Sequence, residues 1–275
     1  MRRRASPGRL ISAAAMLALA ACVIYPLLWM LVSSLKYEYD IFRFPPALFA
    51  PRYTLEHYVD VWRRLPLLRF FVNTIVFAGC VSLLSVFLDA MAGYAFARFR
   101  FRGRDTLFTL VLITMMVPFQ VLMIPLFLEV YKLGLLNTYA GLILPRATSA
   151  FGIYMMRSFF VTLPKELEEA ARIDGLSEFG IFRKIMLPLC TPALLSLGIF
   201  HLVMNWNDLL YPLMLTSTAE MRTLPAGLAT FVGQNVIEYG PTLAGTVLSV
   251  LPLVVAYAFA QRHFIRGIAL SGIKG

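Results

Sequence analysis

The sequence predicts an all-α, polytopic membrane protein, and composition and hydropathy are the observations that predict it. Of the 275 residues, 59% are hydrophobic and only 15% are charged, and the mean hydropathy is +0.74. A soluble core of this size has no room for so much apolar surface. Apolar runs also recur along the chain, each near the roughly 20 residues that a helix needs to cross the hydrocarbon of a bilayer.

Six such runs predict transmembrane helices, at about residues 10–34, 70–95, 106–131, 138–162, 190–216 and 239–262. The third, fifth and sixth contain the uncharged stretches 106–128, 185–207 and 239–261. The second contains Asp89 and the fourth contains Arg146. We expect the whole chain, residues 1–275, to form one transmembrane domain.

The first run has features of both a signal peptide and a retained helix. Three arginines precede it, and "LAAC" at residues 19–22 is similar to a lipoprotein cleavage site. The run, however, is free of charge from Leu10 to Leu35, whereas a signal peptide has an apolar core of about 7–15 residues. The length favours a retained first span.

The distribution of basic residues predicts that both termini are cytoplasmic. With the N-terminus inside, sixteen Lys and Arg residues fall in cytoplasmic segments and eight fall outside, where the loops are longer. This asymmetry follows the positive-inside rule. Of the two longer outer segments, 35–69 and 217–238, the first contains "YTLEHYVDVWRRL", whose spacing predicts a helix lying along the membrane surface and capped at Thr54.

Several function classes find no support in the sequence. The net charge of +10 comes from residues at the ends of apolar runs, where topology signals belong, so nucleic acid is not an expected partner. The three cysteines have no metal-ligand spacing, and the three histidines are on different segments. We therefore expect no metal site, no catalytic residues and no cofactor bound by this chain, which also lacks a GxxxxGK[ST] loop.

A charged stretch between the fourth and fifth spans predicts a cytoplasmic helical hairpin, within a loop at 163–189. "KELEEAARID" consists of strong helix formers with carboxylates near its start, which the helix dipole favours. Gly175 then occupies the position of a left-handed C-cap, and Ser177 can cap a second helix. Phe179, Phe182, Ile185 and Met186 form the apolar face of that second helix.

The same stretch carries a family signature. Glu169-Ala170-Ala171, Gly175 and Ile185-Met186-Leu187-Pro188 match EAA-x3-G-x9-I-x-L-P. This signature resembles that of permease subunits of binding-protein-dependent ABC importers. "GYAFARFRFRGRD" (93–105), "WNDLLYPLML" (206–215) and "QRHFIRGIALSGIKG" (261–275) resemble the carbohydrate-uptake branch, with six spans as in the shorter subunit of the maltose-type pair. Asp89 fits no pattern of that branch.

The resemblance implies how the hairpin works. It is the coupling helix, which docks into a separate cytoplasmic ATPase, with Glu169 paired to a basic residue and the small Ala170 and Ala171 permitting close approach. It also implies that the C-terminal tail, with Gly272 and Gly275, reaches the ATPase. The expected partners are a second homologous permease, an ATPase dimer that uses ATP and Mg²⁺, an extracytoplasmic solute-binding protein and membrane lipid. The expected location is the inner membrane of a prokaryotic cell.

The fifth span carries a polar stripe of His201, Asn205 and Asp208, which are on one helical face because they are spaced at i, i+4 and i+7. Polar groups at membrane depth face the bundle interior or an aqueous path. Two interpretations stay open: the stripe lines a path for sugar hydroxyls, or it forms hydrogen bonds between helices. For Asp89 and Arg146 we expect pairing within the bundle.

The leading hypothesis is a permease subunit of an ATP-driven importer for a sugar or a sugar-like solute such as a glycerol phosphate. The alternative is an ion-driven secondary transporter with Asp89 and Asp208 as coupling carboxylates. The complete coupling signature and the lack of a recognisable inverted repeat favour the importer. An integral membrane enzyme is a remote third class, because the sequence shows no nucleophile–base pair and no metal ligands.

Overall fold

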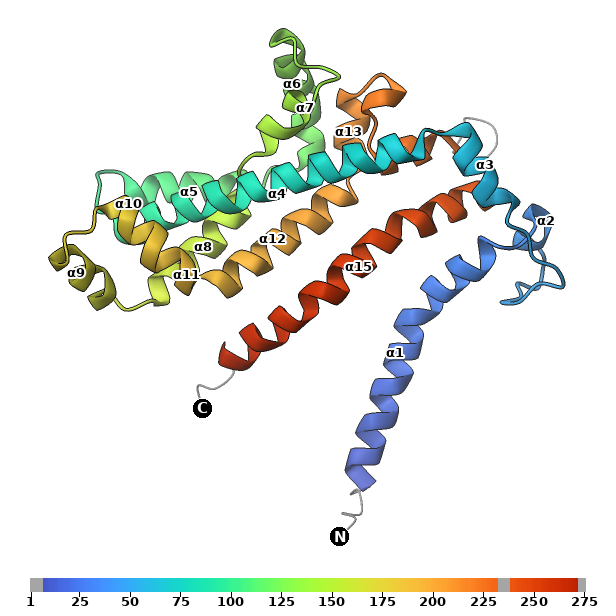
Figure 1. Cartoon of the computed structure of the whole chain (residues 1–275), viewed down its shortest axis with the longest axis horizontal. Coiled ribbons are helices and arrows are strands. Elements are labelled where there is room, and N and C mark those ends of the chain that lie inside the picture. The colour runs from blue at the N-terminus through green and yellow to red at the C-terminus, as the bar shows by residue number, and fades with distance from the viewer. Residues whose placement is uncertain (1–6, 232–237, 272–275) are drawn as a thin grey trace. The chain divides into compact units, whose positions relative to one another are not determined.

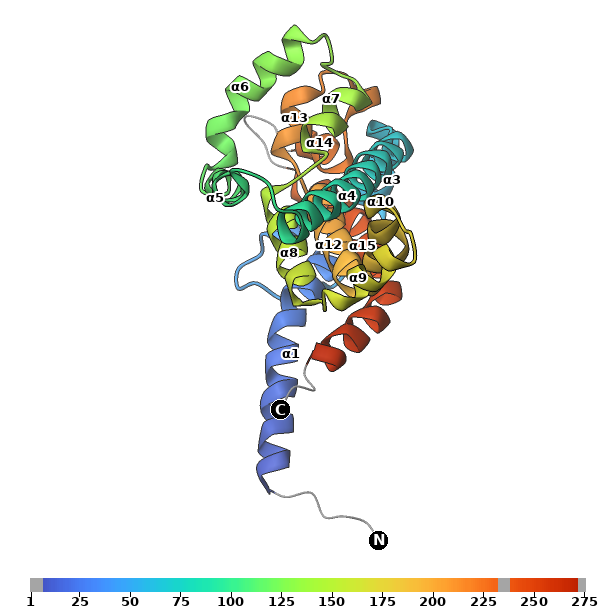
Figure 2. The same ribbon diagram turned by 90° about the vertical axis from the view of Figure 1, so that its left-hand side faces the viewer.

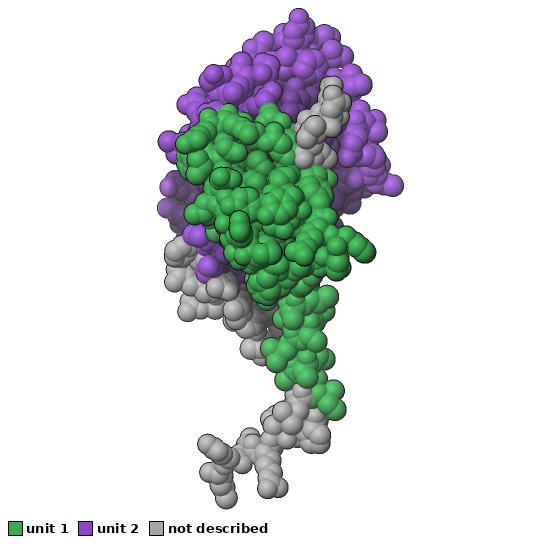
Figure 3. Space-filling view, turned by 90° about the vertical axis from the view of Figure 1, so that its right-hand side faces the viewer, with its two compact units in different colours: residues 1–65, 228–252 green, residues 66–227, 253–275 purple. Residues whose placement is uncertain are grey.

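The structure is a computed structural model that describes residues 7–231 and 238–271. Every regular element in these two ranges is helical, which confirms the all-α prediction. The chain divides into two compact units, residues 1–65 with 228–252 and residues 66–227 with 253–275 (Figure 3).

The first unit contains the expected first span and most of the outer segment. Helix α1 (Pro7–Ser33) closely matches the predicted run at 10–34, and none of its most apolar stretch is buried in the structure. Short helices α2 (Glu38–Ile41) and α3 (Glu56–Arg64) follow, and α3 forms within the stretch for which a helix was expected. The N-cap position is Leu55, one residue later than expected, and the Thr54 hydroxyl accepts a hydrogen bond from the Glu56 N–H at 3.1 Å.

Residues of the outer segment hold the first turn of α15 (Tyr239–Ser271) within this unit. The two carboxylate oxygens of Glu38 accept the N–H groups of Tyr239 and Gly240, each at 2.8 Å. Arg64 pairs with Glu238 at 2.6 Å, one residue before the helix begins. Free N–H groups at a helix start need such acceptors, and the helix dipole favours a carboxylate there.

The second unit is organised around α4 (Leu67–Arg98), which packs along α8 (Ala150–Thr162) and α12 (Thr191–Trp206) (Figures 1 and 2). The buried residues of α4 recur at intervals of three or four, from Leu67 to Tyr94, and so form one stripe along the helix. At Gly93 a side chain is excluded, because a Cβ would lie 2.8 Å from the Cβ of Met156 on α8. Glycine therefore permits the close approach of these two helices.

Three of the six expected spans are interrupted. The third consists of α5 (Arg104–Thr114) and α6 (Phe119–Lys132), bent by 100°. Pro118 immediately precedes α6, and proline both lacks an N–H and disfavours helical geometry at the residue before it. The fourth consists of α7 (Tyr139–Ile143), the 3₁₀ turn η1 (Leu144–Arg146) and α8. The fifth consists of α12 and α13 (Leu210–Leu215).

The remaining elements lie between these spans or in the second outer segment. They are α9 (Glu166–Ile173), α10 (Glu178–Ile181), the π-helical η2 (Phe182–Met186), α11 (Leu187–Leu189), η3 (Ala219–Met221), α14 (Leu224–Leu228) and η4 (Ala229–Phe231). Within the described ranges, Ile11–Ser33 and α4 are each long and apolar enough to cross a membrane. Two bent pairs of helices raise the number to four if each pair is counted as one span. The first pair is α5 with α6, and the second is residues 178–189 with α12, bent by 80°.

Candidate coupling site and membrane-embedded polar network

The hairpin after α8 has the turn that the sequence predicts. Gly175 has a φ of +81°, in the left-handed region that glycine adopts without strain. The Leu176 N–H donates to the Ala171 carbonyl, and the Gly175 N–H donates to the Arg172 carbonyl, both at 3.0 Å. These two bonds make a Schellman motif, which ends α9 and satisfies its free carbonyls.

The second helix of the hairpin begins as expected and is fastened to the first. The Ser177 hydroxyl accepts the Gly180 N–H at 3.2 Å, which caps α10. Arg172 on α9 donates twice to the Glu178 carboxylate, at 2.6 and 3.1 Å. This bidentate bond lowers the pKa of Glu178 and raises that of Arg172.

Helix α9 has one buried side and one exposed side. Of its eight residues, only Glu168 and Ala171 are buried. Glu169 and Ala170 are exposed, and Ile173 is 86% exposed, an unusual state for a large apolar side chain at the tip of a polar hairpin. The helix therefore offers Glu169, Ala170 and Ile173 to its surroundings, whereas Ala171 packs into the core.

The other expected coupling residues are beyond the turn. Ile185 and Leu187 are half-buried against the core cluster that contains Ala171, and Pro188 is exposed. Of the predicted apolar face, Phe182 and Met186 are buried, whereas Phe179 is largely exposed. Gly272 and Gly275 of the tail lie outside the described residues.

Sequence reasoning missed Glu168, which precedes the EAA signature by one position. Its carboxylate pairs with Arg98, the last residue of α4, with an Oε1–Nε distance of 3.0 Å and both side chains at least 96% buried. Burial raises the pKa of Glu168, and the guanidinium groups of Arg98 and Arg172 act against that rise. The sequence offered one signal of this burial: Glu168 and Ala171 are three residues apart, so they lie on the same face of a helix.

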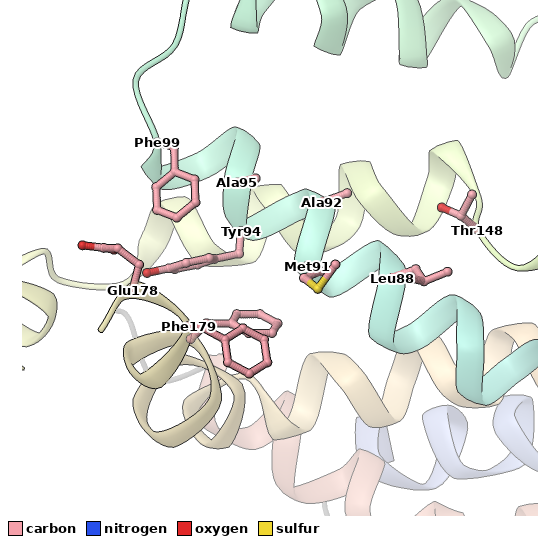
Figure 4. Close-up of a pocket in the computed structure, with 10 residues that line it drawn as sticks. Leu88, Met91, Ala92, Tyr94, Ala95, Phe99, Thr148, Glu178 and Phe179 are labelled. Atoms are coloured by element: carbon pink, nitrogen blue, oxygen red, sulfur yellow. The ribbon is translucent and has the colours of Figure 1, made fainter. Parts of the chain in front are cut away.

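A pocket lies beside this hairpin (Figure 4). It has a volume of about 650 Å³, and α4 supplies half of its lining residues, with Phe99, Thr148 and residues of α10 and η2 completing it. Its lining residues are Leu88, Met91, Ala92, Tyr94, Ala95, Phe99, Thr148, Glu178, Phe179 and Phe182. The rings of Tyr94 and Phe182 are 5.2 Å apart at their centroids, so the second helix of the hairpin packs directly on α4.

A polar network joins α4, α8 and α12 farther along the bundle. One oxygen of the Asp89 carboxylate accepts the Thr148 hydroxyl at 2.7 Å and the Ser149 N–H at 2.8 Å. The other accepts the Ser149 hydroxyl at 2.9 Å and is 3.1 Å from His201 Nε2. Asp89 therefore pairs within the bundle, as expected, and it holds the residue that caps α8.

Arg146 pairs with the rest of the polar stripe. Its Nη2 is 2.6 Å from the Asp208 carboxylate, and its Nη1 donates to the Asn205 side-chain oxygen at 3.2 Å. The guanidinium also lies over the Tyr211 ring, 4.1 Å from its centroid. Every member of the predicted stripe thus has a partner on another helical segment, while Arg146 and Asp208 keep part of their surface exposed. Among the described residues, no cluster of three His, Cys, Asp or Glu is arranged to hold a metal ion.

Comparison with known proteins identifies the family. Residues 89–269 match the family of binding-protein-dependent transport system inner membrane components. The chain belongs to this family. The permease is 38% identical to the arabinooligosaccharides transport system permease protein of Halalkalibacterium halodurans, over 94% of this chain and 93% of the relative. It is 34% identical to the lactose transport system permease protein of Rhizobium radiobacter, over 94% of each.

A solved structure is similar over nearly the whole permease. This is a bacterial ABC transporter involved in the import of the acidic polysaccharide alginate, with a TM-score of 0.80 and 25% identity, covering 95% of this chain and 99% of that one. Family and relatives together identify a permease subunit of a carbohydrate-uptake ABC importer, a multi-pass protein of the cell membrane. The leading hypothesis is confirmed, and the secondary transporter is wrong.

Proposed function

We propose that the permease moves a sugar or sugar-like solute by alternating access, in a complex with a second homologous permease, two ATPase subunits and an extracytoplasmic solute-binding protein. The ATPase subunits bind ATP and Mg²⁺, and this chain binds neither. Six spans with both termini in the cytoplasm put the α9–α10 hairpin on the same side as the ATPase. The arginine-rich turn that follows α4 is on that side too.

The observation that carries this proposal is the two-sided α9 helix. A surface helix that exposes a carboxylate, a small residue and a large apolar residue fits a groove with a basic group and an apolar floor. Glu169 then pairs with the basic group, Ala170 permits close approach, and Ile173 fills the apolar part. Ala171 is on the opposite side, where it seats α9 on the bundle.

Co-purification from the native membrane tests the proposal. A tagged permease in mild detergent should bring down an ATPase and a second permease, and Glu169→Lys should reduce the recovered ATPase because it places a like charge in the basic groove. The matched control is Glu166→Lys, an exposed carboxylate of the first turn of α9 that is outside the signature. Recovery of the same amount of ATPase with Glu169→Lys would contradict the docking role.

The solute class needs a separate measurement. A relative of Escherichia coli, named as an sn-glycerol-3-phosphate transport system permease protein, is 31% identical to this chain, so an anionic solute is the second candidate. The purified complex with its binding protein should hydrolyse ATP faster when the correct solute is added. We expect a neutral oligosaccharide to stimulate hydrolysis and glycerol phosphate not to, because Asp208 neutralises the partly exposed Arg146.

A further inference from the structure

The contacts of Arg98 join three helices at one end of α4. Arg98 is the last residue of α4, and its Nη2 donates to the carbonyl of Leu163, which caps the C-terminus of α8, at 2.7 Å. Its Nε faces the Glu168 carboxylate of α9 at 3.0 Å. One guanidinium thus connects the coupling helix to two helices of the bundle.

Apart from the Arg98–Glu168 pair, α9 is attached by the Arg172–Glu178 bond to α10 and by the packing of its buried side. Its second buried residue, Ala171, contributes a single methyl group to the core. Methyl packing is weak and non-directional, whereas two opposite charges 3.0 Å apart and shielded from water attract each other strongly. Arg172, 3.8 Å from Glu168, is on α9 itself, and its two hydrogen bonds to Glu178 join α9 to α10 and to neither α4 nor α8.

We propose that the Arg98–Glu168 pair is the link through which a displacement of the coupling helix reaches α4 and α8. Both residues are positioning residues, since neither has an exposed surface to offer a partner protein. The inference rests on the proposed docking of α9 on an ATPase. It goes beyond that docking because it assigns the transmission step to two residues outside the family signature.

The link also explains why a charged pair occupies a buried position. Replacing such a pair with apolar residues of similar size is often neutral for stability, so stability alone gives no reason for its presence. A mechanical connection between α9 and the bundle gives a reason for the charged pair. A double variant Arg98→Leu/Glu168→Leu therefore separates the two roles, because it removes the connection without leaving an unpaired buried charge.

The test measures assembly and coupling in the same purified complex. For Glu168→Gln and for the double Leu variant, we expect normal recovery of the ATPase and a loss of solute-stimulated ATP hydrolysis of about tenfold, within the range of coupling between distant sites. Arg98→Lys keeps the charge and should retain part of the stimulation. Arg104→Gln is the matched control, since Arg104 is on the same cytoplasmic turn and pairs with its neighbour Asp105, at 2.9 Å.

A distance measurement tests transmission directly. In a background with Cys22, Cys80 and Cys190 replaced by alanine, spin labels at Glu166→Cys on α9 and Leu83→Cys on α4 occupy two exposed positions outside the proposed docking face. In the complex, the distribution of distances between the two labels should be narrow, and ATP binding should not change it, because the two helices move together. With Glu168→Gln or the double Leu variant, ATP binding should broaden this distribution or shift its mean.

The outcomes separate the two proposals. If the double Leu variant assembles and couples like the original chain, or if ATP changes the label distance in the original complex, the link is wrong although docking stands. If the original chain recovers no ATPase, the proposed function fails and the link fails with it.

Discussion

Asp89 and Ser149 are 60 residues apart in sequence, and yet the carboxylate of Asp89 accepts both the N–H and the hydroxyl of Ser149, the residue that caps α8. The fourth predicted span is interrupted at this point, between η1 and α8. Backbone groups freed by a break at membrane depth need partners inside the protein. Asp89 supplies such a partner for the N–H of Ser149, and this role accounts for a carboxylate that matches no family pattern.

Gly152, three residues into α8, tests this arrangement. A Cβ at Gly152 would overlap the Asp89 carboxylate, so Gly152→Ala should lower stability by about 1–3 kcal/mol, as other overpacked sites do. Gly79→Ala is the matched control, because that α4 glycine has no atom within 4 Å of the added Cβ. We expect it to be neutral or stabilising by up to about 1 kcal/mol. Thermal unfolding in detergent measures both, and equal effects would contradict the tight approach.

The Arg146–Asp208 pair should behave as a coupled unit. Asp208 also accepts the N–H of Tyr211, so it caps the start of α13 as well as neutralising Arg146. In a double-mutant cycle with Arg146→Gln and Asp208→Asn, we expect an interaction energy of about 1–3 kcal/mol in unfolding free energy. Additive effects would contradict the pairing. An unchanged half-saturating solute concentration in either single variant would favour helix–helix bonding over a role in the solute path.

The sequence predicted those features that depend on local chemistry. The glycine turn, the Ser177 cap and the unbroken helices α1, α4 and α15 follow from residue types and from apolar runs of sufficient length. The interruptions of the third, fourth and fifth spans were missed because hydropathy counts apolar residues and is insensitive to backbone direction. Pro118 was visible as a helix breaker, but prolines are tolerated within spans, so it did not decide the matter.

The pairings were harder to foresee because they are tertiary. Asp89, His201 and Ser149 meet only once α4, α8 and α12 have packed together. Periodicity predicted one helical face for His201, Asn205 and Asp208, but α12 ends at Trp206, so Asp208 lies beyond it and that part of the prediction is wrong. Periodicity also could not name the partners of these residues. Glu168 was overlooked for a similar reason, since its role depends on Arg98 at the far end of a different helix.

The exposed pair in the hairpin predicts a dependence on pH. The hydrogen bond from Arg172 lowers the pKa of Glu178 in the folded state below the ordinary 4.5. The stabilisation is therefore fully present above the ordinary value, and it is lost as the pH falls below 4.5 and through the lowered pKa. Hydrogen exchange of residues 174–181, corrected for the intrinsic rate, should show protection that is constant from pH 7 to pH 5 and falls in more acidic buffer. Arg172→Gln should remove that acid-sensitive part, and an unchanged profile would contradict the assignment.

Gly175→Ala should uncouple the permease through backbone strain alone. The added Cβ meets no atom within 4 Å, so the cost comes only from the φ of +81° and is about 1–2 kcal/mol. The strain opens the turn and misdirects α9, so solute-stimulated ATP hydrolysis should fall several-fold, while Gly175→Asn, which tolerates this φ, should fall less. Gly103→Ala is the control, since Gly103 has a φ of +84° and equally open space at the turn between α4 and α5, outside the hairpin. It should cost similar stability in thermal unfolding and leave the stimulation intact; equal uncoupling by both variants would mean that general destabilisation, and not the orientation of α9, governs the loss.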